Sequence, residues 1–285
     1  MDLHKEWLQI KTRSNHLMEA YFVRPKQLKE GLPGILVIHD LYGMSEHIQD
    51  VAERLARSNY FVIAADLYSK NRPPELQQHR LDRLRSLFNT MPTDVWWKAE
   101  ERESYIDQAE DGEQLRETIR ALPTAIYYGP QPERYAAMEE DGKALLDELK
   151  RLGAANVGSV GFCMGGTLTY QLASSYPSLG AAVAFYGNAP KAEKIETIDC
   201  PVLGLYGELD KALMDQLPEL TANMERFGKD FHYVVYKNTD HAFFEDQRVS
   251  FNPDAARDAW ARTLSFFNRY LPEKTDVLTE GSSRF

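Results

Sequence analysis

Three residues of this chain could together carry out nucleophilic catalysis, namely Cys163, Asp210 and His241. A free thiol is only partly ionised near neutral pH, so an imidazole that takes or holds its proton makes it a stronger nucleophile. A carboxylate bound to the other ring nitrogen would fix the orientation of that imidazole. The three residues lie 47 and 31 positions apart. Only a fold that gathers three separate segments could therefore unite them.

The cysteine stands in the segment Gly161-Phe162-Cys163-Met164-Gly165-Gly166, between a strand-like run that begins at Val157 and a helix-like run over 167–174. A sharp strand-to-helix turn strains the residue at its centre, and flanking glycines let the two elements pass each other. The central side chain is then exposed near the positive end of the helix, where a thiolate is favoured. The alternative is a buried structural cysteine beside a glycine-rich turn.

Asp210 and His241 each follow a predicted strand, in the order nucleophile, acid, histidine that is typical of α/β hydrolases. Glu208 and Asp240 are alternative orienting acids. Asp210 is favoured because its loop could reach across the top of the sheet. His39, which also ends a strand, is the second choice for the base.

Two backbone amides are candidates for binding an oxyanion. The N–H of Met164 begins the helix after the cysteine, and a second N–H is expected from Leu41 in the loop after the first inner strand.

The elements that would position these residues alternate along the chain. Apolar runs predict inner strands, and helical patterns lie between them. The inner strands are expected at about 35–39, 60–65, 157–160, 181–186, 201–206 and 231–236, and the main helices at about 45–57, 134–152, 212–227 and 253–270. Segments 7–12 and 18–23 predict an antiparallel edge pair.

This pattern predicts a single α/β domain spanning residues 1–285, with a mostly parallel, doubly wound sheet and helices on both faces. Ligands of such sheets bind at the carboxyl ends of the strands. Residues 69–133 show no buried strand and predict a helical insertion, which is either a lid over the site or a peripheral excursion. The tail from about residue 272 is polar, and we expect it to be poorly ordered.

Composition excludes several classes of protein. The net charge of −10 argues against nucleic acid or an anionic membrane as a partner. No apolar run approaches the length of a membrane span, and the first residues lack a signal-peptide core. Two cysteines provide neither a disulfide framework nor zinc-ligand spacing, so no metal is expected, and Cys200 is interpreted as structural. We therefore expect a soluble, cytoplasmic protein that acts as a monomer or homodimer.

Several motifs together resemble the dienelactone hydrolase family. They are the hexapeptide around Cys163, the segments Asp66-Leu67-Tyr68 and His39-Asp40-Leu41-Tyr42-Gly43, the loop Gly207-Glu208-Leu209-Asp210, and Asp240-His241-Ala242-Phe243. The similarity covers roughly residues 34–68 and 136–270. Each motif alone is weak, whereas their combination is specific.

This resemblance implies an α/β-hydrolase fold and a Cys-His-Asp triad that cleaves an ester or lactone without a cofactor. It implies Cys163 as nucleophile, His241 as base and then acid, and Asp210 as its orienter. The amides of Met164 and Leu41 match the family's oxyanion hole. Asp40 occupies the position of a family glutamate that holds the resting cysteine.

The sequence departs from the family at the substrate carboxylate. Members that hydrolyse dienelactone hold this group with arginines, one of them four residues after the catalytic histidine, where this chain has Glu245. Arg248 is a possible substitute, and Arg83 and Arg85 are candidates for the other arginine. Because a carboxylate in a partly dry pocket repels an anion, the sequence predicts a neutral ester, thioester or lactone as substrate.

Two other functions are compatible with the same residues. A non-catalytic protein on this fold could use the pocket to bind a small molecule, since a fold alone does not determine function. A redox-active thiol protein would need a resolving cysteine, and Cys200 is predicted at the opposite end of the sheet.

Overall fold

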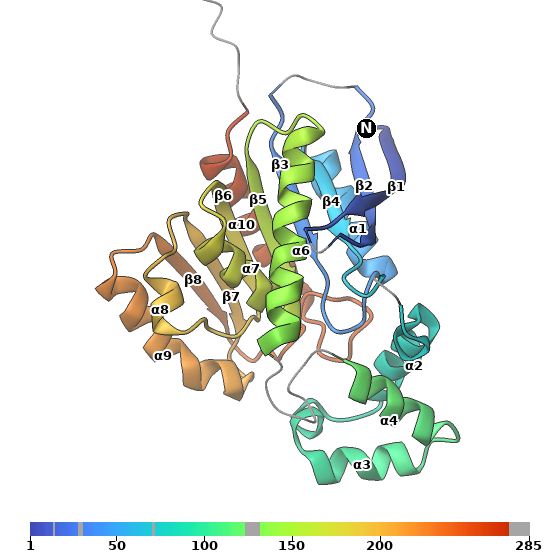
Figure 1. The fold of residues 1–285 in the computed structure, drawn as a ribbon. Helices are drawn as coiled ribbons and strands as arrows, with labels where there is room; N and C mark the ends of the chain where they lie inside the picture. The colour runs from blue at the N-terminus through green and yellow to red at the C-terminus, as the bar shows by residue number, and fades with distance from the viewer. Residues whose placement is uncertain (14, 28–30, 70–71, 123–131, 274–285) are drawn as a thin grey trace, which may run out of the picture.

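In the computed structural model, which describes residues 1–13, 15–27, 31–69, 72–122 and 132–273, eight strands form one sheet in the order β1-β2-β4-β3-β5-β6-β7-β8 (Figure 1). The strands are β1 (Leu3–Lys11), β2 (Leu17–Pro25), β3 (Gly34–Ile38), β4 (Phe61–Ala65), β5 (Val157–Phe162), β6 (Leu179–Phe185), β7 (Val202–Gly207) and β8 (Phe231–Tyr236). In sheet order, the six strands from β4 to β8 pair in parallel. The pairs β1–β2 and β2–β4 are antiparallel. The predicted fold class is confirmed.

The central strands are uniformly apolar because both faces of the sheet are covered. Every residue of β3, β4 and β5 is buried. At the edge, β1 begins at Leu3, four residues before its predicted start. Its pairing with β2 extends from Leu3 opposite Pro25 to Lys11 opposite Leu17, and such non-local pairing leaves little local signal in the sequence.

Helices cover both faces of the sheet, with α6 and α7 in front of it in Figure 1 and α1 and α10 behind. Ser45 caps α1 by accepting a hydrogen bond from the Ile48 amide, and Asn252 caps α10 in the same manner. The main helices are α1 (Glu46–Arg57), α6 (Pro132–Arg151), α7 (Met164–Ser175), α8 (Ala192–Ile195), α9 (Lys211–Arg226) and α10 (Pro253–Tyr270). The short helix α8 was not predicted.

Between β4 and α6 the helices of the described residues are short, and these residues form no strand. The helices are η1 (Pro74–Leu76), α2 (Gln78–Phe88), η2 (Thr93–Trp97), α3 (Ala99–Asp107) and α4 (Gly112–Ala121). Helices α2, α3 and α4 gather beyond one end of the sheet (Figure 1). Parts of the insertion (70–71 and 123–131) and of the tail (274–285) lie outside the described residues. The division into one domain with an insertion stays a prediction.

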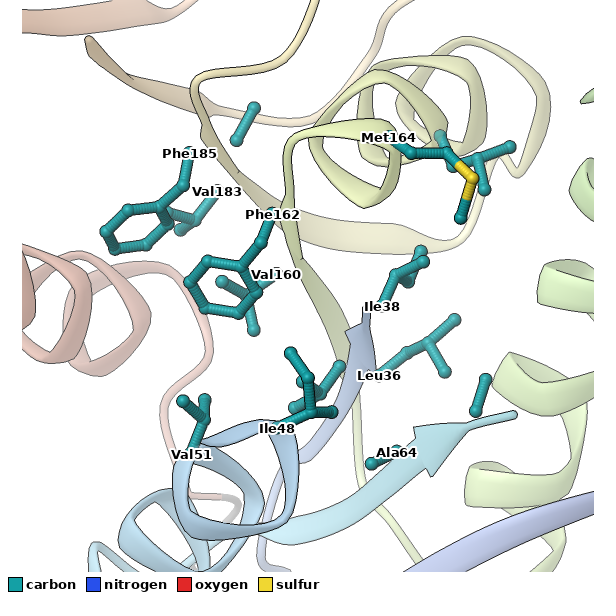
Figure 2. Packing of buried hydrophobic residues seen from close by; sticks show 14 of the residues in the cluster. Leu36, Ile38, Ile48, Val51, Ala64, Val160, Phe162, Met164, Val183 and Phe185 are labelled. Atoms are coloured by element: carbon teal, nitrogen blue, oxygen red, sulfur yellow. The ribbon is translucent and has the colours of Figure 1, made fainter. Parts of the chain in front are cut away.

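The core beneath the cysteine is aromatic. Figure 2 shows Phe162 and Phe185 side by side on neighbouring strands, with Ile48 and Val51 of α1 pointing toward the sheet. The ring centroid of Phe162 lies 4.8 Å from that of Phe185 and 5.5 Å from that of Phe244. Phe244 follows His241 by three residues, so this cluster connects the strand before the cysteine to the histidine loop.

Replacing Phe162 by alanine is expected to lower the free energy of unfolding by about 3–5 kcal/mol, because a large, fully packed ring would leave a cavity. Phe162 is only 2% exposed. Urea denaturation measures the change, and Phe251→Ala is the control because that ring is 37% exposed. A loss below about 1 kcal/mol would show that the cluster collapses without strain.

Candidate active site

The cysteine lies at a strained turn between β5 and α7. Its backbone has φ 53° and ψ −109°, a region that costs a non-glycine residue about 1–3 kcal/mol. The turn is tight because a Cβ added at Gly161 would lie 2.0 Å from the Gly165 oxygen, and one added at Gly165 would lie 2.2 Å from the Ile38 oxygen. The chain on both sides of Cys163 therefore requires glycine, and the side chain of Cys163 is held at the start of α7.

Two of the predicted residues are joined by a hydrogen bond. Asp210 follows β7 and His241 follows β8, and His241 Nδ1 lies 2.5 Å from Asp210 Oδ2. Both side chains are buried, with exposures of 3% for Asp210 and 7% for His241. A carboxylate in this position holds the imidazole in the tautomer with its proton on Nδ1 and supports a positive charge on the ring.

The two alternative acids have other partners. Asp240 accepts hydrogen bonds from its neighbour's backbone, His241 N–H at 2.8 Å, and from the hydroxyl of Thr93 in the insertion. Glu208 accepts the Asn238 N–H at 2.8 Å. Among the described acids, Asp210 is therefore the one that contacts the ring of His241.

His241 and Cys163 interact electrostatically. Burial by itself would lower the pKa of His241, but the charges of Cys163 and Asp210 and hydrogen bonds to both raise this pKa to about 10. An imidazole with so high a pKa is protonated at neutral pH, and its proton then stabilises a thiolate. The arrangement suits a thiolate–imidazolium pair that is ready to attack a carbonyl carbon.

Replacing Cys163 by alanine is expected to lower the pKa of His241 below its value of about 10, because the first of the charges that raise this pKa is removed while the opposing effect of burial remains. An NMR titration of ¹³C-labelled histidine measures the shift. His232 is a suitable internal reference, since it lies exposed on β8. An unchanged titration of His241 would show that the thiol and the ring do not interact.

Four of the candidate residues, Cys163, His241, Leu41 and Asp40, line one pocket. It contains both the proposed nucleophile and the proposed base, and aromatic side chains form much of its wall. The lining residues are Asp40, Leu41, Tyr42, Phe88, Trp96, Cys163, His241, Ala242 and Arg248.

The amides predicted to bind an oxyanion belong to Met164 and Leu41. Met164 is the first residue of α7, and Leu41 lines the pocket after β3. Neither N–H donates a hydrogen bond to any residue that the structure describes. Both donors are therefore available to a developing negative charge.

His39, the second choice for the base, is fully buried and has partners on both ring nitrogens. Nδ1 lies 2.5 Å from the Asp40 carbonyl oxygen, and Nε2 accepts the Leu67 N–H at 3.2 Å. Both ring nitrogens therefore bond to backbone groups, and His39 is absent from the lining of the pocket.

Asp40 reaches the pocket, where its carboxylate accepts the Tyr42 N–H at 2.8 Å. Burial raises the pKa of Asp40, while the Tyr42 amide, Arg248 and Arg85 oppose that rise. No hydrogen bond between Asp40 and Cys163 occurs among the described residues. A role for Asp40 in holding the resting thiol stays a prediction.

Glu245 is not an isolated charge. Its side chain is 3% exposed, and Arg85 Nη1 donates to Glu245 Oε1 at 3.1 Å. Arg83 is paired with Asp111 at 2.7 and 2.8 Å. Neither arginine from the insertion lines the pocket.

Arg248 does line the pocket and is only 5% exposed. Its guanidinium carbon lies 4.9 Å from the ring centroid of Tyr42 and 4.4 Å from that of Trp96. The Nε and Nη1 atoms find no acceptor in the described part of the chain. A buried guanidinium with unused donors is costly, so a ligand that supplies acceptors would be stabilised here.

Sequence reasoning missed the aromatic wall of this pocket. Phe88 and Trp96, which line the pocket, come from the insertion. Tyr186 follows β6, and its ring centroid lies 4.9 Å from that of His241. The one local signal was the pair Trp96-Trp97 within a highly charged segment. The position of Trp96 is fixed by its Nε1, which donates to the Phe88 carbonyl at 2.8 Å.

The second cysteine lies at the opposite end of the sheet from the candidate active site. Cys200 is 5% exposed just before β7, at the end opposite to Asp210, and burial raises its pKa to about 12. The described residues contain no cluster of three or more side chains that could hold a metal ion. They also include no helix that is long and apolar enough to cross a membrane.

A family model described as "Dienelactone hydrolase family" matches residues 18–271 of the chain. A protein of Saccharolobus solfataricus named "Putative carboxymethylenebutenolidase" is 31% identical over 253 residues, which cover 88% of this chain and 94% of that protein. A Bradyrhizobium protein named "Probable 2-oxo-3-(5-oxofuran-2-ylidene)propanoate lactonase" is 25% identical, covering 95% of this chain and 97% of that one.

The fold also matches solved structures. The crystal structure of a "Putative Dienelactone Hydrolase" from Klebsiella pneumoniae superposes with a TM-score of 0.71 at 25% identity, covering 95% of this chain and all of the other. A mixed sheet with helices on both faces is therefore shared by the two proteins.

Proposed function

Because the chain belongs to the dienelactone hydrolase family and is a hydrolase of ester or lactone bonds, we propose that it cleaves them with a Cys163–His241–Asp210 triad. The observation that carries this proposal is that His241, which is bonded to Asp210, lines the same pocket as Cys163. The three groups have the types and the order that nucleophilic catalysis needs.

In the proposed reaction the Cys163 thiolate attacks the carbonyl carbon, and the carbonyl electrons move to oxygen. The amides of Leu41 and Met164 stabilise this oxyanion. When it collapses, the bond to the alcohol oxygen breaks, and the proton of His241 passes to that oxygen. Water then gives a proton to His241 and attacks the thioester, and the thiolate leaves as the acid is released.

A burst of product followed by slower turnover tests the mechanism. We expect p-nitrophenol to be released in one fast equivalent per enzyme from an activated ester, with an acyl group on Cys163 detected by mass spectrometry. A binding protein on the same fold would bind such esters without a burst. Turnover without any acylated Cys163 would refute the covalent route.

The prediction of a neutral substrate depends on Glu245 being an unpaired charge beside the pocket. Glu245 is instead paired with Arg85, and Arg248 is the charged side chain with unused donors in the pocket. We therefore reverse the prediction and propose that the substrate carries an anionic group, a carboxylate in particular, next to Arg248.

Arg248→Met is expected to lower kcat/KM about 10- to 100-fold for a p-nitrophenyl ester whose acyl chain ends in a carboxylate, since charge-assisted hydrogen bonds of about 1.5–3 kcal/mol are lost. The methyl ester of the same substrate should lose much less. Arg83→Met is the matched control, because that side chain pairs with Asp111 away from the pocket. Equal losses for the charged and the neutral substrate would support the earlier prediction that the natural substrate is neutral.

A reducing location such as the cytoplasm fits this mechanism, and we propose it together with a monomeric or homodimeric state. The reaction needs Cys163 as a free thiol, and both cysteines of the structure are free.

A further inference from the structure

His39 is a buried histidine that the triad does not use, and its contacts determine which ring nitrogen carries the proton. A carbonyl oxygen can only accept, so Nδ1 must donate to the Asp40 carbonyl. A backbone N–H can only donate, so Nε2 must accept from Leu67. Only the neutral ring with its proton on Nδ1 satisfies both contacts. Burial, which lowers the pKa of His39, favours that neutral form.

The contact with Asp40 fixes the direction of the next amide. The Asp40–Leu41 peptide is planar and trans, so its carbonyl oxygen and its N–H point in opposite directions. By holding the Asp40 oxygen, His39 points the Leu41 N–H away from itself. That N–H has no acceptor among the described residues, and Leu41 lines the pocket beside Cys163.

The following peptide is held at both of its polar atoms. The Leu41 carbonyl accepts the hydroxyl hydrogen of Tyr68 at 3.2 Å, and the Tyr42 N–H donates to Asp40 Oδ1 at 2.8 Å. The ring of Tyr68 packs against His39 with centroids 4.8 Å apart. Of the four polar groups in the two peptides that flank the Leu41 Cα, only the Leu41 N–H is left without a partner in the described structure.

From these contacts we infer that His39 is a positioning residue that aims the Leu41 N–H at the oxyanion of the reaction. His39 also ties the loop after β3 to the segment after β4 through Leu67, so the amide is supported by two strands of the sheet. The inference rests on the proposed function, because it assigns His39 a part in the same acylation and deacylation of Cys163. Preorganised donors of this kind stabilise the transition state more than the bound substrate.

Two substitutions separate the contacts of His39. In His39→Asn the side-chain amide stands near the position of Nδ1 and can still donate to the Asp40 carbonyl. In His39→Gln the amide reaches toward Leu67 but loses the donor to Asp40. Tyr68→Phe keeps the ring and removes only the hydroxyl that holds the Leu41 carbonyl. Thermal melting of each variant shows whether it folds.

We expect His39→Gln to lower kcat about 10- to 100-fold with KM nearly unchanged, somewhat less than the loss of an oxyanion donor outright. His39→Asn should retain most of kcat, and Tyr68→Phe should show a smaller loss than His39→Gln. The direct readout is the infrared carbonyl stretch of a cinnamoyl thioester on Cys163. In the wild-type protein it should lie below that of a free thioester, and His39→Gln should move it back toward the free value.

Three results would overturn the inference. A wild-type carbonyl frequency in His39→Gln would show that the amide is aimed without this contact. Equal losses in the asparagine and glutamine variants, with matching losses of thermal stability, would mean a purely structural role. Failure of the wild-type protein to form a cinnamoyl thioester at Cys163 would refute the proposed function itself and this inference with it.

Discussion

Replacing Cys163 by alanine is expected to lower kcat for ester hydrolysis by about 10⁴-fold or more, because the proposed acyl intermediate forms on this thiol. The pocket, the His241–Asp210 bond and the two amides would persist in the variant. Substrate should therefore still bind. Steady-state kinetics with p-nitrophenyl esters of graded acyl length, together with lactones and thioesters, measures the loss.

The matched control is Cys200→Ala, which removes the other thiol of the chain. Cys200 is buried just before β7 and is absent from the pocket, so activity should stay within about twofold of the wild-type value for a folded variant. Substantial hydrolysis by Cys163→Ala, or a loss that follows Cys200 instead, would contradict the assignment of the nucleophile.

Asp210→Asn is expected to lower kcat about 10³- to 10⁴-fold while leaving the fold intact. An asparagine amide in this position can donate to the ring, and it would favour the wrong tautomer of His241. Asp240→Asn and Glu208→Gln are matched controls, since both acids bind backbone N–H groups and not the ring. We expect these two variants to lose only a few-fold in activity.

The same substitution should change the pH dependence in a definite direction. In the proposed mechanism the active form is the thiolate–imidazolium pair, which is lost when His241 releases its proton at a pKa of about 10. The charge of Asp210 is one cause that raises this pKa against the effect of burial. In Asp210→Asn the alkaline limit of kcat/KM for ester hydrolysis, where His241 must give its proton to the leaving alcohol, should therefore move to lower pH. An unchanged alkaline limit would show that the charge of Asp210 does not affect the pKa of His241.

Local signals predicted much of the architecture. The helix expected at 253–270 is α10, because an asparagine cap and Pro253 at the first helical position mark its beginning. The strands β3 and β5 were recognisable because burial on both faces leaves an uninterrupted apolar run. The early start of β1 was not recognisable in the sequence, because it depends on pairing with β2.

The charge in the pocket shows the limit of such reasoning. From the sequence, Glu245 made the site repel anions. In the structure Glu245 accepts a hydrogen bond from Arg85, which lies 160 residues earlier in the chain, and Arg248 lines the pocket. No pattern along the chain reveals which of several arginines meets which acid.

By itself the sequence determined the order of strands and helices, the glycine-flanked turn at Cys163 and the set of residues able to do chemistry. These features depend on backbone propensities and on burial patterns within a few neighbouring residues. The tertiary structure decided which acid contacts the imidazole of His241, which peptide His39 holds, and that aromatic side chains of the insertion form a wall of the pocket. Hydrogen bonds and ion pairs join groups within a few ångströms of each other, and only the folded chain brings such distant positions together.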